Sequence, residues 1–168
     1  SGEVKWSQPA AAHTSSIVIA DGQLLYLDRQ MAIHCLDAGS GAEIWRAAGL
    51  NPLNRPNYRV VGTPIINGDM IFAPTRKNPL LALRAGGKGD ITESHLIWKY
   101  EGSGAPDVPS PICDGKYLYL VDDRGLVTCL EAETGRLVYG PEKTREGIVS
   151  ASPIIAEGRM YILNERGV

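Results

Sequence analysis

The sequence lacks the features that mark a membrane span, a nucleic-acid surface or a helical protein. No apolar run approaches the roughly 20 residues that a membrane-spanning helix needs. The 17 lysines and arginines are balanced by 19 aspartates and glutamates, and a net charge of −2 gives no basic footprint for nucleic acid. No segment keeps the apolar period of an amphipathic helix over about ten residues. We therefore expect a globular chain with no membrane span and no nucleic-acid partner.

Cysteine and histidine are scarce and scattered, at Cys35, Cys113 and Cys129 and at His13, His34 and His95. An odd number of cysteines is not a disulfide framework, and no Cys-x-x-Cys pair indicates zinc. The histidines have no metal-ligand spacing, and no nucleophile elbow or phosphate loop accompanies them. We expect Cys35 and Cys129, which share one repeat position, to be small core residues and His34 to point to the opposite strand face from Cys35. No catalytic, cofactor-binding or metal-binding residue is predicted.

Glycine and proline, by contrast, are abundant and dispersed, with 19 and 11 residues. This composition is typical of many short strands and turns. An acid or asparagine followed by glycine recurs between apolar segments and favours hairpin turns, because both central residues need positive φ. The pairs are Asp21-Gly22, Asn67-Gly68, Asp114-Gly115 and Glu157-Gly158. Their glycines lie 46, 47 and 43 residues apart, which indicates a repeated supersecondary unit.

A second motif recurs within these units. Residues 35–45 read CLDAGSGAEIW and residues 129–139 read CLEAETGRLVY, and a stretched copy runs over residues 82–98. Each copy predicts a strand, a tight turn and a second strand that reaches an aromatic residue. The recurring structural residues are the acids Asp37 and Glu131, the glycines Gly41 and Gly135, and the aromatic residues Trp45, Trp98 and Tyr139.

Each unit resolves into four strands, which we denote A to D. In the second, third and fourth units strand A carries a proline at its start, which has no N–H to donate to a ladder, and strand B is almost continuously apolar. The expected strands are 17–20, 24–28, 33–38 and 43–46; 64–66, 70–75, 80–85 and 96–100; 110–113, 117–122, 126–132 and 137–139; and 153–156 and 160–164. Residues 4–6 are expected to be the last strand of a preceding unit.

These units predict an all-β fold, namely a β-propeller fragment of four-stranded antiparallel blades, three complete and a fourth in part. The blades are expected at about 14–49, 62–102, 108–143 and 150–168 of a single partial domain over residues 1–168, with 1–8 ending a preceding blade. A β-sandwich is the alternative, but it would not require glycine pairs at near-constant spacing. Both ends look cut, so a longer chain is expected to supply the remaining blades.

At the motif over residues 35–45 and 129–139, the chain resembles the PQQ-like (pyrroloquinoline-quinone-type) β-propeller repeats. The resemblance implies that the strand-D aromatic residue, Trp45, Trp98 or Tyr139, packs across to the next blade. It also implies either a scaffold like the outer-membrane-protein assembly lipoproteins or a quinoprotein dehydrogenase. Members are commonly exported, which favours the periplasm or extracellular space, whereas three unpaired cysteines favour the alternative, the cytoplasm.

The enzymes of this family carry a disulfide between adjacent cysteines over the quinone, together with calcium-ligating carboxylates. This sequence has no adjacent cysteine pair, and we cannot place calcium ligands on it. We therefore expect no cofactor and a non-catalytic scaffold for protein or ligand binding. The alternative is part of a PQQ-dependent quinoprotein dehydrogenase, with PQQ and calcium bound by blades outside this stretch.

In propellers the B–C and D–A loops project from one face. Arginine occurs in every B–C loop, and Arg29, Arg124 and Arg166 have an acidic neighbour with which we expect them to pair. The residues without such a neighbour are the candidate site for a protein or a small anionic ligand: Arg55, Tyr58, Arg59, Arg76 and Lys77. Changing Arg59 and Arg76 to alanine is expected to weaken binding without lowering the melting temperature.

Two loops interrupt the repeat. Residues 51–59 are long for a connection between blades, and residues 86–95 enlarge the C–D turn of the second unit. Long loops on a rigid scaffold are common binding elements. They are expected on opposite faces and hence not in one site. The glycines of 86–95 favour a mobile insertion.

Overall fold

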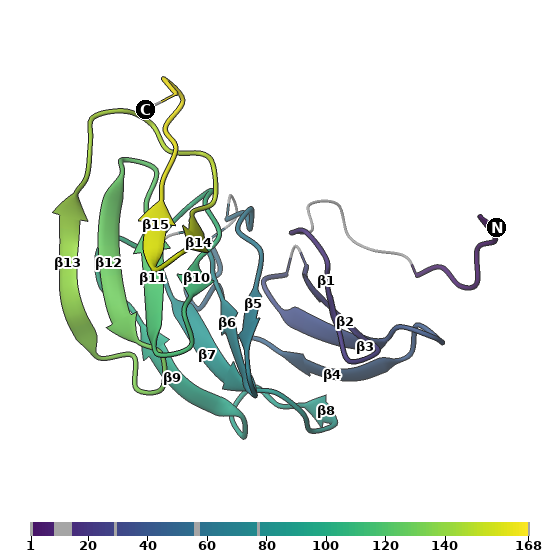
Figure 1. Ribbon diagram of the computed structural model, residues 1–168. Helices are drawn as coiled ribbons and strands as arrows, with labels where there is room; N and C mark the ends of the chain where they lie inside the picture. Colours follow the sequence, from purple (N-terminus) through teal and green to yellow (C-terminus); the bar gives the residue numbers. More distant parts are fainter. Residues whose placement is uncertain (1, 9–14, 29, 56–57, 77, 168) are drawn as a thin grey trace.

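A computed structural model describes residues 2–8, 15–28, 30–55, 58–76 and 78–167. These residues form fifteen strands and no helix. None of them lies in a helix long and apolar enough to cross a membrane. The strands assemble into successive sheets that stand side by side along the chain (Figure 1). The predicted all-β fold of four-stranded antiparallel sheets is confirmed.

The first three sheets each contain a four-stranded meander, and the fourth is a single hairpin. The first sheet comprises β1 (Val18–Ala20), β2 (Gln23–Leu27), β3 (Ile33–Asp37), β4 (Glu43–Ala47) and β8 (Gly89–Asp90). The second comprises β5 (Ile65–Asn67), β6 (Met70–Ala73), β7 (Leu80–Arg84) and β9 (Leu96–Tyr100). The third comprises β10 (Ile112–Cys113), β11 (Tyr117–Val121), β12 (Leu126–Glu131) and β13 (Leu137–Lys143), and the fourth β14 (Ile154–Ala156) and β15 (Arg159–Tyr161).

The start of strand A links the second sheet to the third and the third sheet to the fourth. The ladders begin after the prolines at 64, 111 and 153, because proline has no N–H to donate. The residue before each proline has a hydroxyl group instead. The Thr63 amide donates to Ser110 Oγ over 2.8 Å, and the Ser110 amide donates to Ser152 Oγ over 2.9 Å. These bonds give a physical reason for the repeated Thr-Pro and Ser-Pro pairs.

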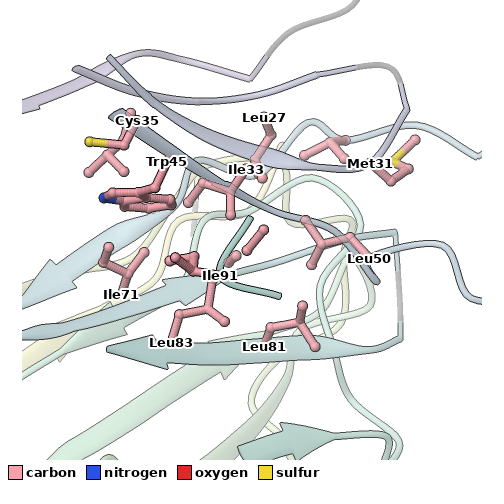
Figure 2. Close-up of a cluster of buried hydrophobic side chains, with 14 residues drawn as sticks. Leu27, Met31, Ile33, Cys35, Trp45, Leu50, Ile71, Leu81, Leu83 and Ile91 are labelled. Carbon is pink, nitrogen blue, oxygen red and sulfur yellow. The ribbon is translucent and has the colours of Figure 1, made fainter. Parts of the chain in front are cut away.

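The core lies between the sheets rather than inside any one of them. Figure 2 shows Cys35 and Trp45 of the first sheet facing Ile71 and Leu83 of the second. The other face of the second sheet packs through a separate cluster against the third. All four residues of β6 are buried, as expected for a strand covered on both faces.

The small residue of the repeated motif lies directly opposite the strand-D aromatic residue. The cross-strand pairs are Cys35 with Trp45, Ala82 with Trp98, and Cys129 with Tyr139. A register shift follows each of these pairs on strand C. The free Cys35 and Cys129 are buried, in agreement with the expectation that they are small core residues.

The acid and glycine of the motif build the C–D turn. Asp37 Oδ1 accepts bonds from the Ser40 amide and hydroxyl over 2.7 and 2.6 Å, and the Gly41 amide donates to Asp37 O. Glu131, Thr134 and Gly135 form the equivalent turn in the third sheet, where Thr134 Oγ1 donates to Glu131 Oε2 over 2.8 Å.

The glycine of each turn also supports an indole ring. Trp98 of the second sheet donates from Nε1 to Ala132 O over 3.0 Å, and a Cβ on Gly135 would lie 2.6 Å from its ring. Trp6 makes the same bond to Ala38 O, and a Cβ on Gly41 would lie 2.7 Å from its ring. Residues 4–6 pair with no described strand, so the expected last strand of a preceding unit stays a prediction.

The enlarged C–D turn of the second sheet is an ordered connection to the first sheet, contrary to the expected mobile insertion. Its β8 pairs in parallel with β4, which places Gly89 opposite Trp45 and Asp90 opposite Arg46. Ile91 is 1% exposed in the core between the two sheets. Because this insertion replaces the short turn, the buried Trp45 Nε1 has no hydrogen-bond partner among the described residues.

Candidate functional site

The meander brings four loops to one end of the stacked sheets, the end at which the C-terminus lies in Figure 1. We call this end the arginine rim and define it by the described residues of loops 48–64, 74–79, 101–111 and 122–125. The first and third are D–A connections, and the other two are B–C connections. Loops far apart in the sequence meet there because antiparallel strands reverse direction at every turn.

Asp107 is the centre of the rim. Arg59 Nη2 donates to Asp107 Oδ2 over 3.0 Å, and Arg59 Nε donates to Oδ1 over 3.3 Å. Arg76 Nε donates to the same Oδ2 over 3.1 Å. The Asp107 side chain is 8% exposed, against 53% for Arg59 and 39% for Arg76. A buried carboxylate therefore fixes two exposed guanidinium groups that belong to different loops.

The neighbouring B–C loop has the same arrangement. Arg124 binds Asp122 Oδ2 through Nε and Nη2 over 2.9 and 2.7 Å, whereas we expected it to pair with the adjacent Asp123. The Asp122 side chain is 7% exposed and that of Arg124 is 69% exposed. Asp123 Oδ1 accepts the amides of Asp107 and Val108 over 3.2 and 3.1 Å, which ties this loop to the preceding D–A loop.

These contacts correct one premise of the sequence prediction. Arg59 and Arg76 have no acid beside them in the sequence, but Asp107 pairs with both in the fold. Removing both arginines would leave a buried carboxylate without a cation, and this is strongly destabilising. The double alanine variant is therefore unsuitable as a binding test at constant stability.

Two adjoining hollows open on the rim. The first has a volume of about 470 Å³ and lies among Arg76, Arg124 and the loop over residues 102–107. The second, of about 390 Å³, lies under loop 51–58, and its lining includes Leu53 and Pro79. Asn78 lines both hollows, so they are neighbours on the surface.

The second hollow is held open by hydrogen bonds. Tyr58 donates its hydroxyl to Asn78 O, and Asn78 Nδ2 donates to Glu101 O over 3.0 Å. The Arg55 amide donates to Asn51 Oδ1 over 3.0 Å, and Asn51 Nδ2 donates back to Arg55 O over 3.1 Å. Loop 51–55 is thus closed on itself, with the Leu53 side chain left 70% exposed.

The structure brings together most of the predicted site residues. Arg76 lines the first hollow, Arg55 and Tyr58 line the second, and Arg59 meets Arg76 at Asp107. Lys77 and Arg29 lie outside the described residues. Sequence reasoning missed Asp107, Asn78 and Leu53. Asp107 could have been found from the predicted strand order, since loop 101–111 is a D–A connection and projects from the same end as the arginine loops.

The described residues form no catalytic or metal-binding constellation. They contain no group of three or more histidine, cysteine or acidic side chains that could hold a metal ion. Burial raises the pKa of the Cys35 thiol to about 11, which suppresses the nucleophilic thiolate. Cys113 and Cys129 are also free, and burial raises the pKa of each.

His34 joins two carboxylates on the first sheet, away from the rim hollows. Its Nε2 lies 3.0 Å from Asp28 Oδ2 and its Nδ1 lies 2.7 Å from Glu43 Oε2. The ring stacks on Tyr26 at 5.0 Å and 12°. The Asp28 hydrogen bond raises the pKa of His34 against the effect of burial, and Glu43 raises it further. This arrangement satisfies an imidazolium ion and leaves no free ring nitrogen for base catalysis.

Known proteins share features of this chain. The family model described as outer membrane protein assembly factor BamB matches residues 1–168. A search of the curated proteins finds no match. Among solved structures, BamB from Moraxella catarrhalis superposes with a TM-score of 0.64 at 17% identity, covering 88% of this chain and 42% of that chain.

Two further solved structures share the architecture. The quinohemoprotein alcohol dehydrogenase ADHIIG from Pseudomonas putida HK5 gives a TM-score of 0.59 at 16% identity, covering 78% of this chain and 20% of that chain. The computationally designed Ika4 protein gives a TM-score of 0.69 at 10% identity, covering 99% of this chain and 92% of that chain. At these identities the likenesses show the fold alone, and a fold shared by an assembly factor and a dehydrogenase does not fix the activity.

Proposed function

The chain belongs to the PQQ-like β-propeller family whose model is described as outer membrane protein assembly factor BamB, and from this premise we propose that it is a non-catalytic scaffold that binds a protein partner on the arginine rim. The family description refers to outer-membrane protein assembly, which supports a periplasmic location. The chain spans 42% of the length of the Moraxella BamB structure, so both points are proposals for the longer protein.

One observation carries the binding proposal: the rim holds its carboxylates inside and its guanidinium groups outside. Asp107 and Asp122 are nearly buried, whereas the arginines that they fix remain substantially exposed. The arginine planes are therefore oriented before a partner arrives, and less side-chain entropy is lost on binding. The rim also combines exposed arginines with a tyrosine, and these two residue types contribute much of the binding energy at protein interfaces.

The rival function, a quinone-dependent dehydrogenase, needs residues that this part of the fold does not supply. Calcium takes six to eight oxygen ligands, typically with several carboxylates. The described residues contain no group of three or more acidic, histidine or cysteine side chains that could hold a metal ion. The acids of the rim are instead committed to arginines and backbone amides. These residues therefore do not fit PQQ with calcium.

Photocrosslinking in the source cells tests the location of the binding surface. A photoreactive phenylalanine analogue replaces Arg55 on the rim of the full-length protein, or Lys88 on the insertion at the opposite end. We expect discrete cross-linked protein adducts from position 55, and we expect the same adducts to be absent from position 88. Equal adducts at both positions, or none at either, contradict the proposal.

The cross-linked partner, once purified, allows the rim to be tested quantitatively. Arg55→Ala removes an exposed side chain, and Arg76→Lys keeps a cation beside Asp107 but loses the planar fork. We expect each change to raise the Kd by about 5-fold to 10-fold, or about 1 kcal/mol. Lys88→Ala is the matched control and is expected to leave the Kd unchanged. Unchanged affinity in both rim variants would refute the assignment.

A further inference from the structure

The two hollows on the rim differ in chemistry, although Asn78 lines both. In the second hollow, Pro52, Leu53 and Pro79 supply an apolar lining, and the Tyr58 ring joins them. Leu53 is 70% exposed, so its side chain is an uncovered apolar surface on a loop closed by its own hydrogen bonds. An apolar side chain from a partner could cover Leu53 there and gain the free energy of burial.

The first hollow presents guanidinium groups at its surface although its lining holds more acids than arginines. Arg76 and Arg124 line it with Asp107, Asp122 and Asp123, and Arg59 contacts Asp107 without being part of the lining. Because Asp107 and Asp122 are nearly buried, a partner meets guanidinium groups first. Arg76 uses only Nε for Asp107, and Arg124 uses Nε and Nη2 for Asp122, so further N–H groups remain for a ligand.

This combination fits a single carboxylate better than a polyanion. Each arginine already has one carboxylate partner, and Asp123 in the first hollow and Glu101 in the second add negative charge. A ligand with many negative charges would therefore meet repulsion at both ends of the surface. A single carboxylate can receive the remaining guanidinium N–H groups in a bidentate geometry.

We propose that the rim binds an extended segment of its protein partner through an apolar side chain in the second hollow and, two residues later or earlier, a side-chain carboxylate in the first. Successive side chains of an extended chain point to opposite sides, so residues i and i+2 face the same surface. The two hollows adjoin at Asn78, which suits this spacing. This inference rests on the proposed function, because it names the part of the partner that the rim recognises.

Capped heptapeptides test the inference without a known partner. The probe is acetyl-Gly-Ser-Leu-Gly-Glu-Gly-Ser-amide, and its controls carry glutamine in place of glutamate or alanine in place of leucine. Binding to the isotope-labelled full-length protein is followed by NMR up to about 5 mM, a range suited to isolated segments. We expect the two controls to bind at least about 5-fold more weakly than the probe, with shifts confined to the rim loops.

Two protein variants assign each preference to its hollow. Arg76→Gln leaves Arg59 on Asp107 and is expected to abolish the preference for glutamate while keeping the preference for leucine. Leu53→Ala is expected to abolish the preference for leucine while keeping the preference for glutamate. Succinate is a further probe, because this free dicarboxylate offers two negative charges without the apolar side chain. Succinate binding as tight as the peptide, equal binding of all peptides, or no peptide binding overturns the inference.

Negative results in the peptide experiment and in the cross-linking experiment refute different proposals. Adducts at position 55 together with equal peptide binding would leave the scaffold proposal standing and remove the segment proposal. Peptide binding that follows both preferences, without any adduct in cells, would keep the chemistry of the rim and remove the proposed partner function.

Discussion

At the scale of single residues, the chain places charge by choosing which member of each ion pair is buried. On the rim, Asp107 and Asp122 are buried and their arginines are exposed. On the first sheet a histidine is the enclosed member: the His34 side chain is 14% exposed between Asp28 and Glu43. A buried group that needs its charge makes folding depend on pH.

We predict that His34 stabilises the fold only while it is protonated. Its folded-state pKa is raised, so its contribution is complete below the unfolded value near 6.5 and is lost as the pH rises through the folded value. Arg46 lies 3.9 Å from Glu43 and competes weakly for that carboxylate. His34→Gln should therefore cost about 1 kcal/mol at pH 5.5 and less near pH 9. Urea unfolding at each pH measures this difference.

Asp28 sets the acid limit of the same cluster. Burial alone would raise the pKa of Asp28, but hydrogen bonds from His34 and the Ala32 amide lower it overall. Its contribution is therefore present above the unfolded value near 3.9 and is lost as the pH falls through the folded value. Glu43→Gln is the control for His34, because it removes one of the two carboxylates that contact the ring. It should partly reduce the loss of unfolding free energy that the wild type shows as the pH rises. Parallel pH profiles for the wild type and His34→Gln would contradict the whole account.

At the scale of elements, the C–D turn joins one sheet to the next. Its glycine has a positive φ, and it also leaves space for the tryptophan of the preceding sheet. Trp6 and Trp98 occupy equivalent turns, whereas the second sheet replaces the turn by β8 and leaves Trp45 Nε1 without a described partner. One structural problem, fixing a sheet to its neighbour, is thus solved in two ways.

Gly135→Ala should separate these two demands on the glycine. The new Cβ would lie 2.6 Å from the Trp98 ring, and φ is +70°, so we expect a loss of about 2–4 kcal/mol from strain and overpacking together. Gly22→Ala is the matched control, because Gly22 has φ of +72° and nothing within 4 Å of the added Cβ. It should cost only about 1–2 kcal/mol. Chemical denaturation measures both.

A second background sharpens the comparison. If the clash with the indole causes the extra loss, Gly135→Ala should cost about as much as Gly22→Ala once Trp98 is changed to alanine. Equal losses for the two glycine variants in the wild-type background would show that the ring moves aside and that φ alone matters.

At the scale of the whole molecule, the stacked sheets bring the loops that form the rim to one end. The same architecture occurs in BamB and in a quinohemoprotein dehydrogenase, so the residues at the loops decide the role. Here the rim acids are tied to arginines and amides rather than gathered as metal ligands.

We predict that the full-length protein does not respond to PQQ and calcium. Added together, they should leave the absorbance of the quinone unshifted and produce no dye reduction with alcohols, as the scaffold proposal requires. Quinone alone and calcium alone are the controls. A saturable spectral shift accompanied by dye reduction would instead support the dehydrogenase.

The repeat, and with it the fold, can be predicted from the amino-acid sequence alone. Short-range signals sufficed, because turn glycines, prolines at strand starts and the small residue opposite an aromatic one act through local geometry. The strands of the four sheets accordingly lie close to their expected positions, and β8 is the unexpected addition.

The charge pattern of the rim and the role of the insertion could be seen only in the folded chain. Arg59 and Arg76 meet Asp107 across 48 and 31 positions of sequence, and β8, which lies between two strands of the second sheet in the sequence, pairs with β4 of the first sheet. Such contacts depend on how whole sheets stack, and local propensity carries no information about a partner so distant in the chain.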